Sequence, residues 1–371
     1  MTKSKEHQLC IQTAFLSFQK DQETGKKLYN QKQIANLLDK SPTSIKRYLE
    51  MAEDLGFIKT EVKIPEEYKD LLPNRNFILE NSLFELFKSR CIVFKDACDP
   101  YSEIASYLTT NLRKQSNQTI ITSWGYTLRK VANSMGSIGN NKKNTVYPLS
   151  GDYPLNYLKQ VFGKNKSHLP YSKIIENSAN RNAFAFAQNS GAKPAPSIIS
   201  PAMIVDLNNK LSSKDILMSC KPLLRMDNTL RFLYGNIYDH SFKKNNKPIF
   251  INNVTLITSI GSTLPEFSEI DTNEEKIKVY HQKIDAIVGN LGGVIFNHDF
   301  QETEINYRIP IGVNLNFFKS IAANQDNVGL GIVIIGIGEH KIAPLKTIMK
   351  HKAANLVLTN EATATALLNK G

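Results

Sequence analysis

The sequence predicts an α/β protein in two parts: an N-terminal winged helix-turn-helix and a larger Rossmann-like domain with a doubly wound, mostly parallel sheet. Three observations lead to this prediction. The first sixty residues hold two short helix-like stretches around a tight turn. After residue 78, apolar runs alternate with amphipathic stretches. A polar segment with two prolines lies between them and is typical of a linker. The predicted domains are therefore 1–62 and 79–371, joined by the linker 63–78.

The composition is that of a globular protein, with 41% apolar and 22% charged residues in 371. That length exceeds one ordinary domain and suits a large α/β domain with a small one. The sequence has no run of 18 apolar residues, and its first ten residues lack the apolar core of a signal peptide. We therefore expect no membrane segment and a cytoplasmic protein.

Cysteine and histidine spacing gives no sign of a metal site. The four cysteines form no C-x-x-C pair and the seven histidines no H-x-x-x-H pair. The thiols are expected to be reduced and to pack as small apolar groups. No metal and no cofactor is expected. The formal net charge of +12 favours polyanionic partners, either nucleic acid or anionic small molecules.

The N-terminal region is predicted to hold three helices and a strand. A short helix covers 33–38, and the next begins after Ser41, a good N-cap. The strand is expected at 57–62. The second helix turns one apolar face inward, formed by Ile45, Leu49, Ala52 and Leu55. An earlier helix, roughly 7–20, is expected to pack across the pair through Leu9, Ala14, Phe15 and Phe18.

The outward face of this helix pair suits DNA. Helix-turn-helix proteins place the second helix in the major groove with its N-terminal end toward the bases. The candidate DNA-binding residues are Gln31, Gln33, Ser41, Thr43, Ser44, Lys46 and Arg47. The alternative is a plain helical hairpin with a solvated face, and the net charge of this region, only +2, leaves it open. The acidic residues of the second helix lie in its C-terminal half, away from the expected contact.

In the larger domain, predicted strands and helices alternate. The strands are expected at 89–97, 118–124, 144–151, 254–261, 286–296, 331–338 and 355–361. Helical spacing covers 102–114, 127–135 and 178–191. Ligands of such sheets bind beyond the carboxyl ends of the strands. Two polar loops fall there, 123–127 and 336–341.

Both loops could hold an anion. In the first, Ser123 and Thr127 offer hydroxyls, Gly125 lets the backbone approach a ligand, and a helix N-terminus follows. In the second, His340 and Lys341 lie at a helix start, where a bound phosphate would balance them. A pair of ordinary tight turns is the alternative. The chain has no G-x-x-x-x-G-K-[ST] motif, and a dinucleotide site at "GIGEHK" would need a glycine in place of the lysine.

Six segments, in the same order, resemble the SorC/DeoR-type sugar-binding transcriptional regulators of bacteria. They are "QKQIANLLDKSPTSIKRYLEMAEDLGFI", "TSWGYTLRKVA", "VYPLSG", "SIGS", "IVGNLGGVIFNHDF" and "GIGEHKIAPLKTIM" with "NLVLTNEATATALL". The resemblance covers nearly the whole chain. It implies a homotetrameric regulator that binds double-stranded operator DNA through a winged helix-turn-helix. It also implies an effector domain similar to the ribose-phosphate isomerase and glucosamine-phosphate deaminase fold.

The resemblance further implies a phosphorylated sugar as effector. It assigns the phosphate to a loop matching Ser123, Gly125, Tyr126 and Thr127 and to the lysine matching Lys341. The sugar hydroxyls meet the position matching Asn290. The other effector-binding positions that it implies are Ser150, Gly151, Asn177, Ser178, Asn180 and Gly261.

The chain departs from the family pattern in three places. Asn290 and Asn360 stand where the family usually has acids. The change at Asn290 can alter sugar preference, because an amide donates as well as accepts, whereas Asn360 can still cap the following helix. The span 200–261 is longer than usual, and an insertion near 235–250 is expected to be a surface loop.

The leading hypothesis is thus a transcriptional regulator controlled by a sugar phosphate, and not an enzyme. A phosphosugar isomerase or deaminase is the second hypothesis. It needs a positioned acid and base, for which Glu339, His340 and Glu361 are available but Asn290 is not suited. A DNA-binding scaffold without an effector is the third. The sequence identifies neither the sugar nor the operator.

Overall fold

The computed structural model divides the chain into two compact units, Met1–Leu72 and Pro73–Gly371. Each unit is described by itself. The residues that the structure describes are 3–20, 27–58, 74–136, 143–152, 176–199, 203–205, 226–239, 253–262, 287–303, 308–310, 313–324 and 327–369. The predicted linker, 63–78, overlaps the second unit, because Phe77 is the first residue of a helix in that unit.

The N-terminal unit contains a helix-turn-helix packed on a third helix. The helices are α1 (Lys3–Phe18), α2 (Gln31–Leu37) and α3 (Pro42–Asp54). Asn30 and Gln33 form a capping box at the start of α2, and the Ser41 hydroxyl accepts from the Ser44 N–H at 3.1 Å at the start of α3. The small core consists of Cys10, Ala14, Ile34, Ala35, Ile45, Tyr48 and Ala52.

Two predictions about this core were wrong. Leu55, expected on the inward face of the second helix, is the C-cap of α3 and is 42% exposed. Phe15 and Phe18 are 66% and 55% exposed, although they were expected to pack inward. The inward face of α1 carries Thr13 and Ser17 instead, beside Cys10 and Ala14. A helix as weakly amphipathic as α1 does not reveal its buried face by its apolar residues alone. The strand expected at 57–62 lies, from residue 59 on, outside the described residues.

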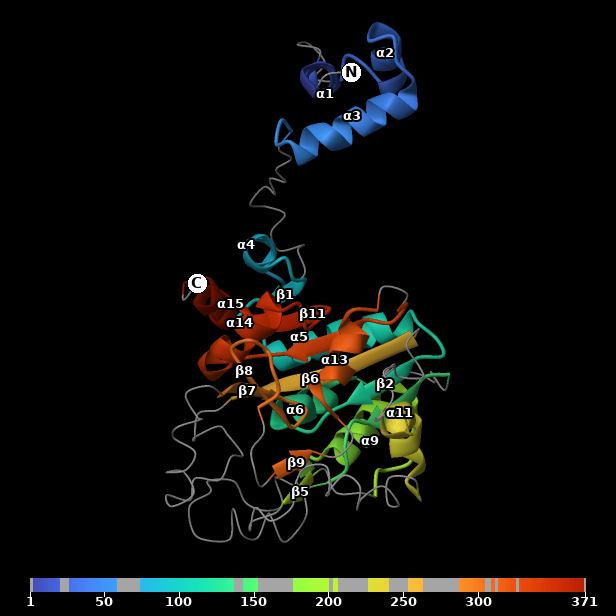
Figure 1. The fold of residues 1–371 in the computed structure, drawn as a ribbon, viewed down its shortest axis with the longest axis vertical. Coiled ribbons are helices and arrows are strands. Elements are labelled where there is room, and N and C mark those ends of the chain that lie inside the picture. Colours follow the sequence, from blue (N-terminus) through green and yellow to red (C-terminus); the bar gives the residue numbers. More distant parts are fainter. Residues whose placement is uncertain are drawn as a thin grey trace. The chain divides into compact units, whose positions relative to one another are not determined.

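The second unit is built on a parallel sheet with the strand order β1-β11-β10-β6-β2-β3-β4 (Figure 1). All six pairings along this path are parallel. The strands are β1 (Cys91–Phe94), β2 (Thr119–Thr122), β3 (Thr145–Pro148), β4 (Lys193–Pro194), β6 (Val254–Ser262), β10 (Gly331–Ile335) and β11 (Leu356–Asn360). A separate antiparallel pair joins β5 (Met203–Val205) to β9 (Arg308–Pro310).

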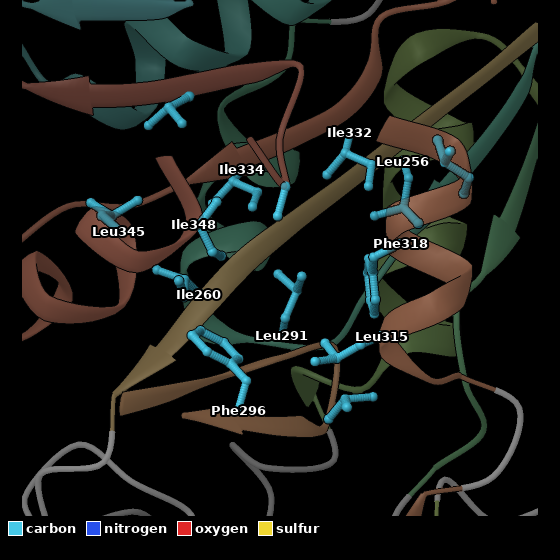
Figure 2. Packing of buried hydrophobic residues seen from close by; sticks show 14 of the residues in the cluster. Leu256, Ile260, Leu291, Phe296, Leu315, Phe318, Ile332, Ile334, Leu345 and Ile348 are labelled. Atoms are coloured by element: carbon cyan, nitrogen blue, oxygen red, sulfur yellow. The ribbon is translucent and has the colours of Figure 1, made fainter. Parts of the chain in front are cut away.

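Helices cover both faces of the sheet, so the prediction of a doubly wound α/β fold is confirmed. One face packs against α5 (Pro100–Arg113), α6 (Tyr126–Ser134) and α9 (Ala179–Ser190). The helices on the other face are α4 (Phe77–Phe87), α11 (Asn228–Asp239), α13 (Leu315–Ala322), α14 (Ile342–Lys350) and α15 (Glu361–Asn369). Figure 2 shows part of this second core, with Ile260 of β6 and Ile334 of β10 beside Leu345 and Ile348 of α14.

The segment 286–296 was predicted as one strand, but from Ile287 on it is a hairpin. β7 (Ile287–Leu291) and β8 (Val294–Asn297) pair antiparallel, and the turn residues Gly292 and Gly293 both have positive φ. Because glycine adopts positive φ without strain, Gly292 and Gly293 can form the tight turn that reverses the chain between the two strands. β7 also pairs antiparallel with the end of β6. The first residues of the expected insertion, 235–239, belong to α11, and 240–252 lie outside the described residues.

A buried carboxylate fastens α4 to the edge of the sheet. Glu80 accepts from the Val93 backbone N–H of β1 at 3.0 Å and from the Arg75 guanidinium Nε at 2.9 Å. Its side chain is only 12% exposed. The hydrogen bond from Glu80 raises the pKa of Arg75 above its usual value. Removal of one member of such a buried pair leaves the other charge without compensation.

We predict that Glu80→Ala lowers the free energy of unfolding of the second unit by about 1 to 3 kcal/mol, because the pair is only partly buried and the Val93 N–H also loses its acceptor. Urea denaturation followed by far-ultraviolet circular dichroism measures the loss. Glu85→Ala is the matched control, because Glu85 pairs with Lys88 on the same helix while both side chains are more than half exposed. The control should change stability by less than about 1 kcal/mol. Equal losses in the two variants would contradict the structural role of Glu80.

Candidate functional site

The two halves of the sheet meet between β2 and β6. From β2 the chain continues to β3 and β4 on one side, and from β6 it continues to β10 and β11 on the other. The pair is therefore the point where the strand order reverses. In open α/β sheets, ligands bind outside the carboxyl ends of the strands at such a point. Ser123 follows β2 directly at this edge, and the last residues of β6 extend past it.

A hydroxyl pair joins the two strands at this edge. Ser123 Oγ lies 2.8 Å from Thr258 Oγ1, and both side chains are buried. Ser123 Oγ also lies 3.1 Å from the Trp124 carbonyl oxygen. The pair fixes the direction in which the chain leaves β2, toward the start of α6.

Gly125 brings the start of α6 close to β6. It is the N-cap of α6, with φ at 132° and no side-chain cap. A Cβ atom added there would lie 2.7 Å from Ser259 Oγ of β6. Since a side chain at this position would both strain the backbone and clash, only glycine lets the first turn of α6 approach β6 this closely.

Asn182 holds this loop in place from α9. Its side chain is fully buried, and its amide nitrogen lies within 3.1 to 3.3 Å of three carbonyl oxygens, those of Ser123, Gly125 and Asn177. The Gly125 N–H in turn donates to the Asn177 carbonyl at 2.9 Å. Sequence reasoning missed Asn182. The available signal was a polar residue on the apolar face of α9, in line with Ala179 and Phe186.

Lys341 reaches the same strand from the other half of the sheet. It ends the short 3₁₀ helix η3 (Glu339–Lys341) between β10 and α14, and its ammonium donates to the Ile260 carbonyl of β6. Burial and the positive charge of Lys341 lower the pKa of His340, so the neutral imidazole is favoured at pH 7.

Asn290 lies across the end of β6 from β7. It pairs in register with Gly261, and a Cβ atom on Gly261 would lie 2.4 Å from the Asn290 amide nitrogen. The glycine therefore leaves the space that the asparagine side chain occupies. Asn290 is 7% exposed, and its side chain makes no hydrogen bond within the described part of the chain.

Four consecutive residues of β6 thus contact four different parts of the site. Thr258 meets Ser123, Ser259 meets Gly125, Ile260 accepts from Lys341, and Gly261 lies under Asn290. Trp124 belongs to the same cluster. Its indole nitrogen would lie 3.7 Å from a Cβ atom added to Gly293, in the β7–β8 turn. We call residues 258–261 with these partners the β6 cluster.

The remaining predicted effector residues lie around this cluster in varied roles. Ser150 and Gly151, after β3, are buried, and the Ser150 hydroxyl has no hydrogen-bond partner within the described residues. Ser178 caps α9 through the Arg181 N–H. Asn180 bonds Asp152 and the backbone of Ile198, so its amide ties loops together. The Tyr126 ring is exposed and stacks with the Lys130 ammonium at 4.7 Å, while Thr127 is half-buried.

A groove of about 1100 Å³ adjoins the cluster along α6 and α9. Arg129, Arg181, Asp152 and Asn180 are among the residues that line it, together with the exposed Phe184. The groove therefore carries two arginines and one carboxylate beside the candidate site.

On the N-terminal unit, the predicted DNA-binding residues divide into cap residues and exposed cations. Gln33 and Ser41 serve as cap residues of α2 and α3. Lys46 lies 3.8 Å from Glu50, and Arg47 lies 3.2 Å from Glu6 of α1, with all four side chains at least a third exposed. The Arg47 guanidinium also stacks on the Tyr48 ring at 5.2 Å. Gln31 and Thr43 are exposed, and Ser44 is half-buried.

Among the described residues, no three histidine, cysteine, aspartate or glutamate side chains lie close enough to hold a metal ion. In the same part of the chain, no helix combines the length and the apolar character needed to cross a membrane.

Solved structures of bacterial transcriptional regulators share this fold. The full-length sorbitol operon regulator SorC from Klebsiella pneumoniae superposes with a TM-score of 0.54 at 15% identity, over 97% of this chain and 98% of that chain. A DeoR family transcriptional regulator from Listeria monocytogenes gives 0.52 at 16% identity, over 78% and 98%. The sugar-binding domain of a transcriptional repressor from Vibrio fischeri gives 0.53 at 16% identity, over 80% and 99%.

At these identities the likeness concerns the fold. It confirms that this chain has the fold of the SorC/DeoR-type regulators, which the sequence resemblance implies. No family model matches the sequence, and no curated protein matches it. Activity, effector and partners therefore rest on the geometry of the site.

We predict that Asn182→Ala loosens the loop after β2 and destabilises the second unit by roughly 1 to 3 kcal/mol, since the buried Ser123 carbonyl loses its side-chain donor while the Gly125 and Asn177 carbonyls keep a backbone donor each. Urea denaturation measures the stability, and Trp124 fluorescence reports the loop. Gln188→Ala on the exposed side of the same helix is the control and should alter neither. If the two variants behave alike, Asn182 does not hold the loop.

Proposed function

We propose that the protein is a DNA-binding transcriptional regulator whose operator binding is controlled by a phosphorylated sugar bound at the β6 cluster. The single observation that carries this proposal is the convergence on β6 of a helix N-terminus, a lysine and a buried amide. Each of these groups suits a different part of a sugar phosphate. As a regulator of transcription in a bacterial cell it would act in the cytoplasm.

The phosphate site would lie between α6 and Lys341. The first turn of α6 starts at Gly125 without a side-chain cap, so its N–H groups and the positive end of the helix dipole are available to an anion. Lys341 adds a full positive charge, and its ammonium is already directed to β6 by the Ile260 carbonyl. Both features favour a doubly charged phosphate over a neutral hydroxyl.

The sugar would lie toward Asn290 and Ser150. Asn290 offers an amide that can donate and accept, and the Ser150 hydroxyl is buried without a partner among the described residues. A buried polar group gains most from a ligand that supplies its missing hydrogen bond. Sugar hydroxyls supply such bonds in both directions.

The DNA site would be the exposed N-terminal half of α3. Lys46 and Arg47 lie beside Thr43 at the end of the helix that enters the major groove in helix-turn-helix proteins. The arginine can exchange its partner Glu6 for a phosphate or a base edge. Dimers of such units read two half-sites, which agrees with the expected homo-oligomer.

An isomerase or deaminase is less well supported. An amide at position 290 cannot abstract a proton. Glu361, one of the acids considered from sequence, is engaged by Asn76 at 2.8 Å and by the Asp96 N–H at 3.0 Å. Its carboxylate therefore joins loops of the sheet edge. Turnover of an aldose or ketose phosphate by the wild type, absent in Lys341→Ala, would favour the enzyme instead.

We predict that Lys341→Met lowers the affinity for the sugar phosphate about tenfold to a hundredfold, because a charge-assisted hydrogen bond is lost. Titration of Trp124 fluorescence with a panel of sugar phosphates, each paired with the free sugar, measures the affinity. Lys350→Met, at the exposed end of α14, is the matched control and should bind like the wild type. Equal affinity of the Lys341 variant would place the phosphate elsewhere.

For the DNA site, Arg47→Ala is expected to weaken operator binding by about 1 to 3 kcal/mol. The operator is first selected from a random DNA pool with the full-length protein, and binding is measured by fluorescence anisotropy at fixed salt. Glu6→Gln is the control, because it frees Arg47 without removing it, and it should bind at least as tightly as the wild type. Unchanged binding by Arg47→Ala would remove Arg47 from the interface.

A further inference from the structure

One buried hydroxyl fastens the 3₁₀ helix that carries Lys341 to the helix behind it. The Lys341 N–H donates to the Gly338 carbonyl at 3.0 Å, and the Gly338 N–H donates to the Thr363 hydroxyl of α15 at 2.8 Å. Gly338 has φ at 106°, so it adopts a conformation that other residues rarely reach. Because Thr363 is only 1% exposed, water does not compete for this bond. The Thr363 hydroxyl therefore sets where the backbone at the start of η3 lies.

Thr363 extends this contact to an amide and a carboxylate. Its single proton is donated to the Asn360 side-chain oxygen at 2.6 Å. The Asn360 amide nitrogen donates to Asp96, after β1, at 2.6 Å. Since a carboxylate can only accept, every bond from the Gly338 N–H onward is donated toward Asp96. The last of these bonds is charge-assisted, which makes it the strongest of the series.

Asp96 and Glu361 connect the series to the start of α4. The second oxygen of Asp96 accepts from the Ala362 N–H at 2.8 Å, and the Asp96 N–H donates to Glu361 at 3.0 Å. The other Glu361 oxygen accepts from the Asn76 amide at 2.8 Å. Asn76 is the N-cap of α4, and its side-chain oxygen accepts from the Leu79 N–H at 3.1 Å. Figure 1 shows α4 beside α15, with which it is in contact.

The amide at position 360 suits this series better than the acid that the family resemblance implies. An acid there would place a second carboxylate beside Asp96, and the two like charges would repel each other. The amide instead accepts from Thr363 and donates to Asp96. Its role is thus different from the helix cap expected from the sequence, because Asp96 accepts from the Ala362 N–H of α15.

We propose that this series of hydrogen bonds, which we call the η3–α4 network, transmits a change at Lys341 to the start of α4. The network runs from Gly338 through Thr363, Asn360, Asp96 and Glu361 to Asn76. A phosphate that draws the Lys341 ammonium away from the Ile260 carbonyl would move η3, and Gly338 with it. Because the chain enters the second unit just before Asn76, a change at this cap alters the segment that leads to the DNA-binding helices. Only the phosphate at Lys341 rests on the proposed function.

Amide hydrogen exchange of the full-length protein, without any ligand, tests the η3–α4 network. The measured quantity is the exchange rate of the peptide 76–87, which contains the Leu79 N–H. Thr363→Val keeps the shape of the side chain but removes the hydroxyl. It should make this peptide exchange about tenfold faster, because a weakened cap lets the first turn of α4 open. Thr365→Val is the matched control, the same substitution at an exposed position of α15, and should leave the rate unchanged. Equal rates in the two variants would overturn the proposal.

A second substitution, at the η3 end, separates transmission from a general loosening of α15. Gly338→Ala strains the positive φ of this residue, and its Cβ atom would lie 2.9 Å from the His340 ring. It should speed exchange of the peptide 76–87 about threefold to tenfold in the wild type and in Thr365→Val. In Thr363→Val it should add less than about twofold, since the network is already interrupted. Equal effects of Gly338→Ala in the two backgrounds would show that no coupling runs through Thr363 and would overturn the network.

The sugar phosphate that Trp124 fluorescence selects gives the third readout. It should change both the exchange of the peptide 76–87 and the operator affinity in the wild type and in Thr365→Val. In Thr363→Val both changes should fall to less than about a third, although the sugar phosphate still binds. An undiminished response in Thr363→Val would overturn the network. If no sugar phosphate binds the wild type, the proposed function fails, and the Gly338→Ala comparison without ligand still decides whether η3 and α4 are coupled.

Discussion

The carboxyl end of β6 is the constraint on which the rest of the site depends. β6 is the strand where the two halves of the sheet meet: it pairs with β2 on one side and with β10 on the other, and its last residues extend past both to pair with β7. Thr258 to Gly261 contact, in order, the loop after β2, the start of α6, the lysine before α14 and the amide of β7. Figure 1 shows β6 as the long strand running through the middle of the sheet. A shift of this strand by one residue would exchange all four contacts.

The cluster combines rigid and adaptable parts. The loop after β2 is held by a buried hydroxyl pair and by three bonds from Asn182, so the start of α6 is fixed before any ligand arrives. Lys341 lies on a short 3₁₀ helix, and Asn290 lies on a hairpin that pairs with the end of β6. A ligand that draws these two elements toward α6 would change the edge of the second unit. Regulation requires such a difference in shape between the two states.

Much of this was predictable from sequence, and the failures have physical causes. The strands at 118–124, 254–261 and 331–338 and the polar loops after them follow from alternation of apolar and polar runs. Gly125 and Lys341 could be predicted as site residues because the conformational freedom of glycine and the positive charge of lysine follow from the residue type alone. Asn182 was missed: its place on the apolar face of α9 was a signal of burial, but the sequence does not show which carbonyl oxygens folding brings to it. Phe15 and Phe18 were predicted to pack inward because large apolar side chains are usually buried. The turn at Gly292 and Gly293 was missed although two glycines between two apolar runs are a sequence signal of a hairpin.

The central claim is that the β6 cluster and the helix-turn-helix are coupled through one ligand. Operator anisotropy measured against increasing sugar phosphate, with the matching free sugar as control, tests it most directly. One phosphorylated sugar is expected to change operator affinity, and the operator is expected to change the affinity for that sugar by the same factor, since coupling is reciprocal. The free sugar should have no such effect. A sugar phosphate that saturates Trp124 fluorescence while operator affinity stays constant would contradict the account.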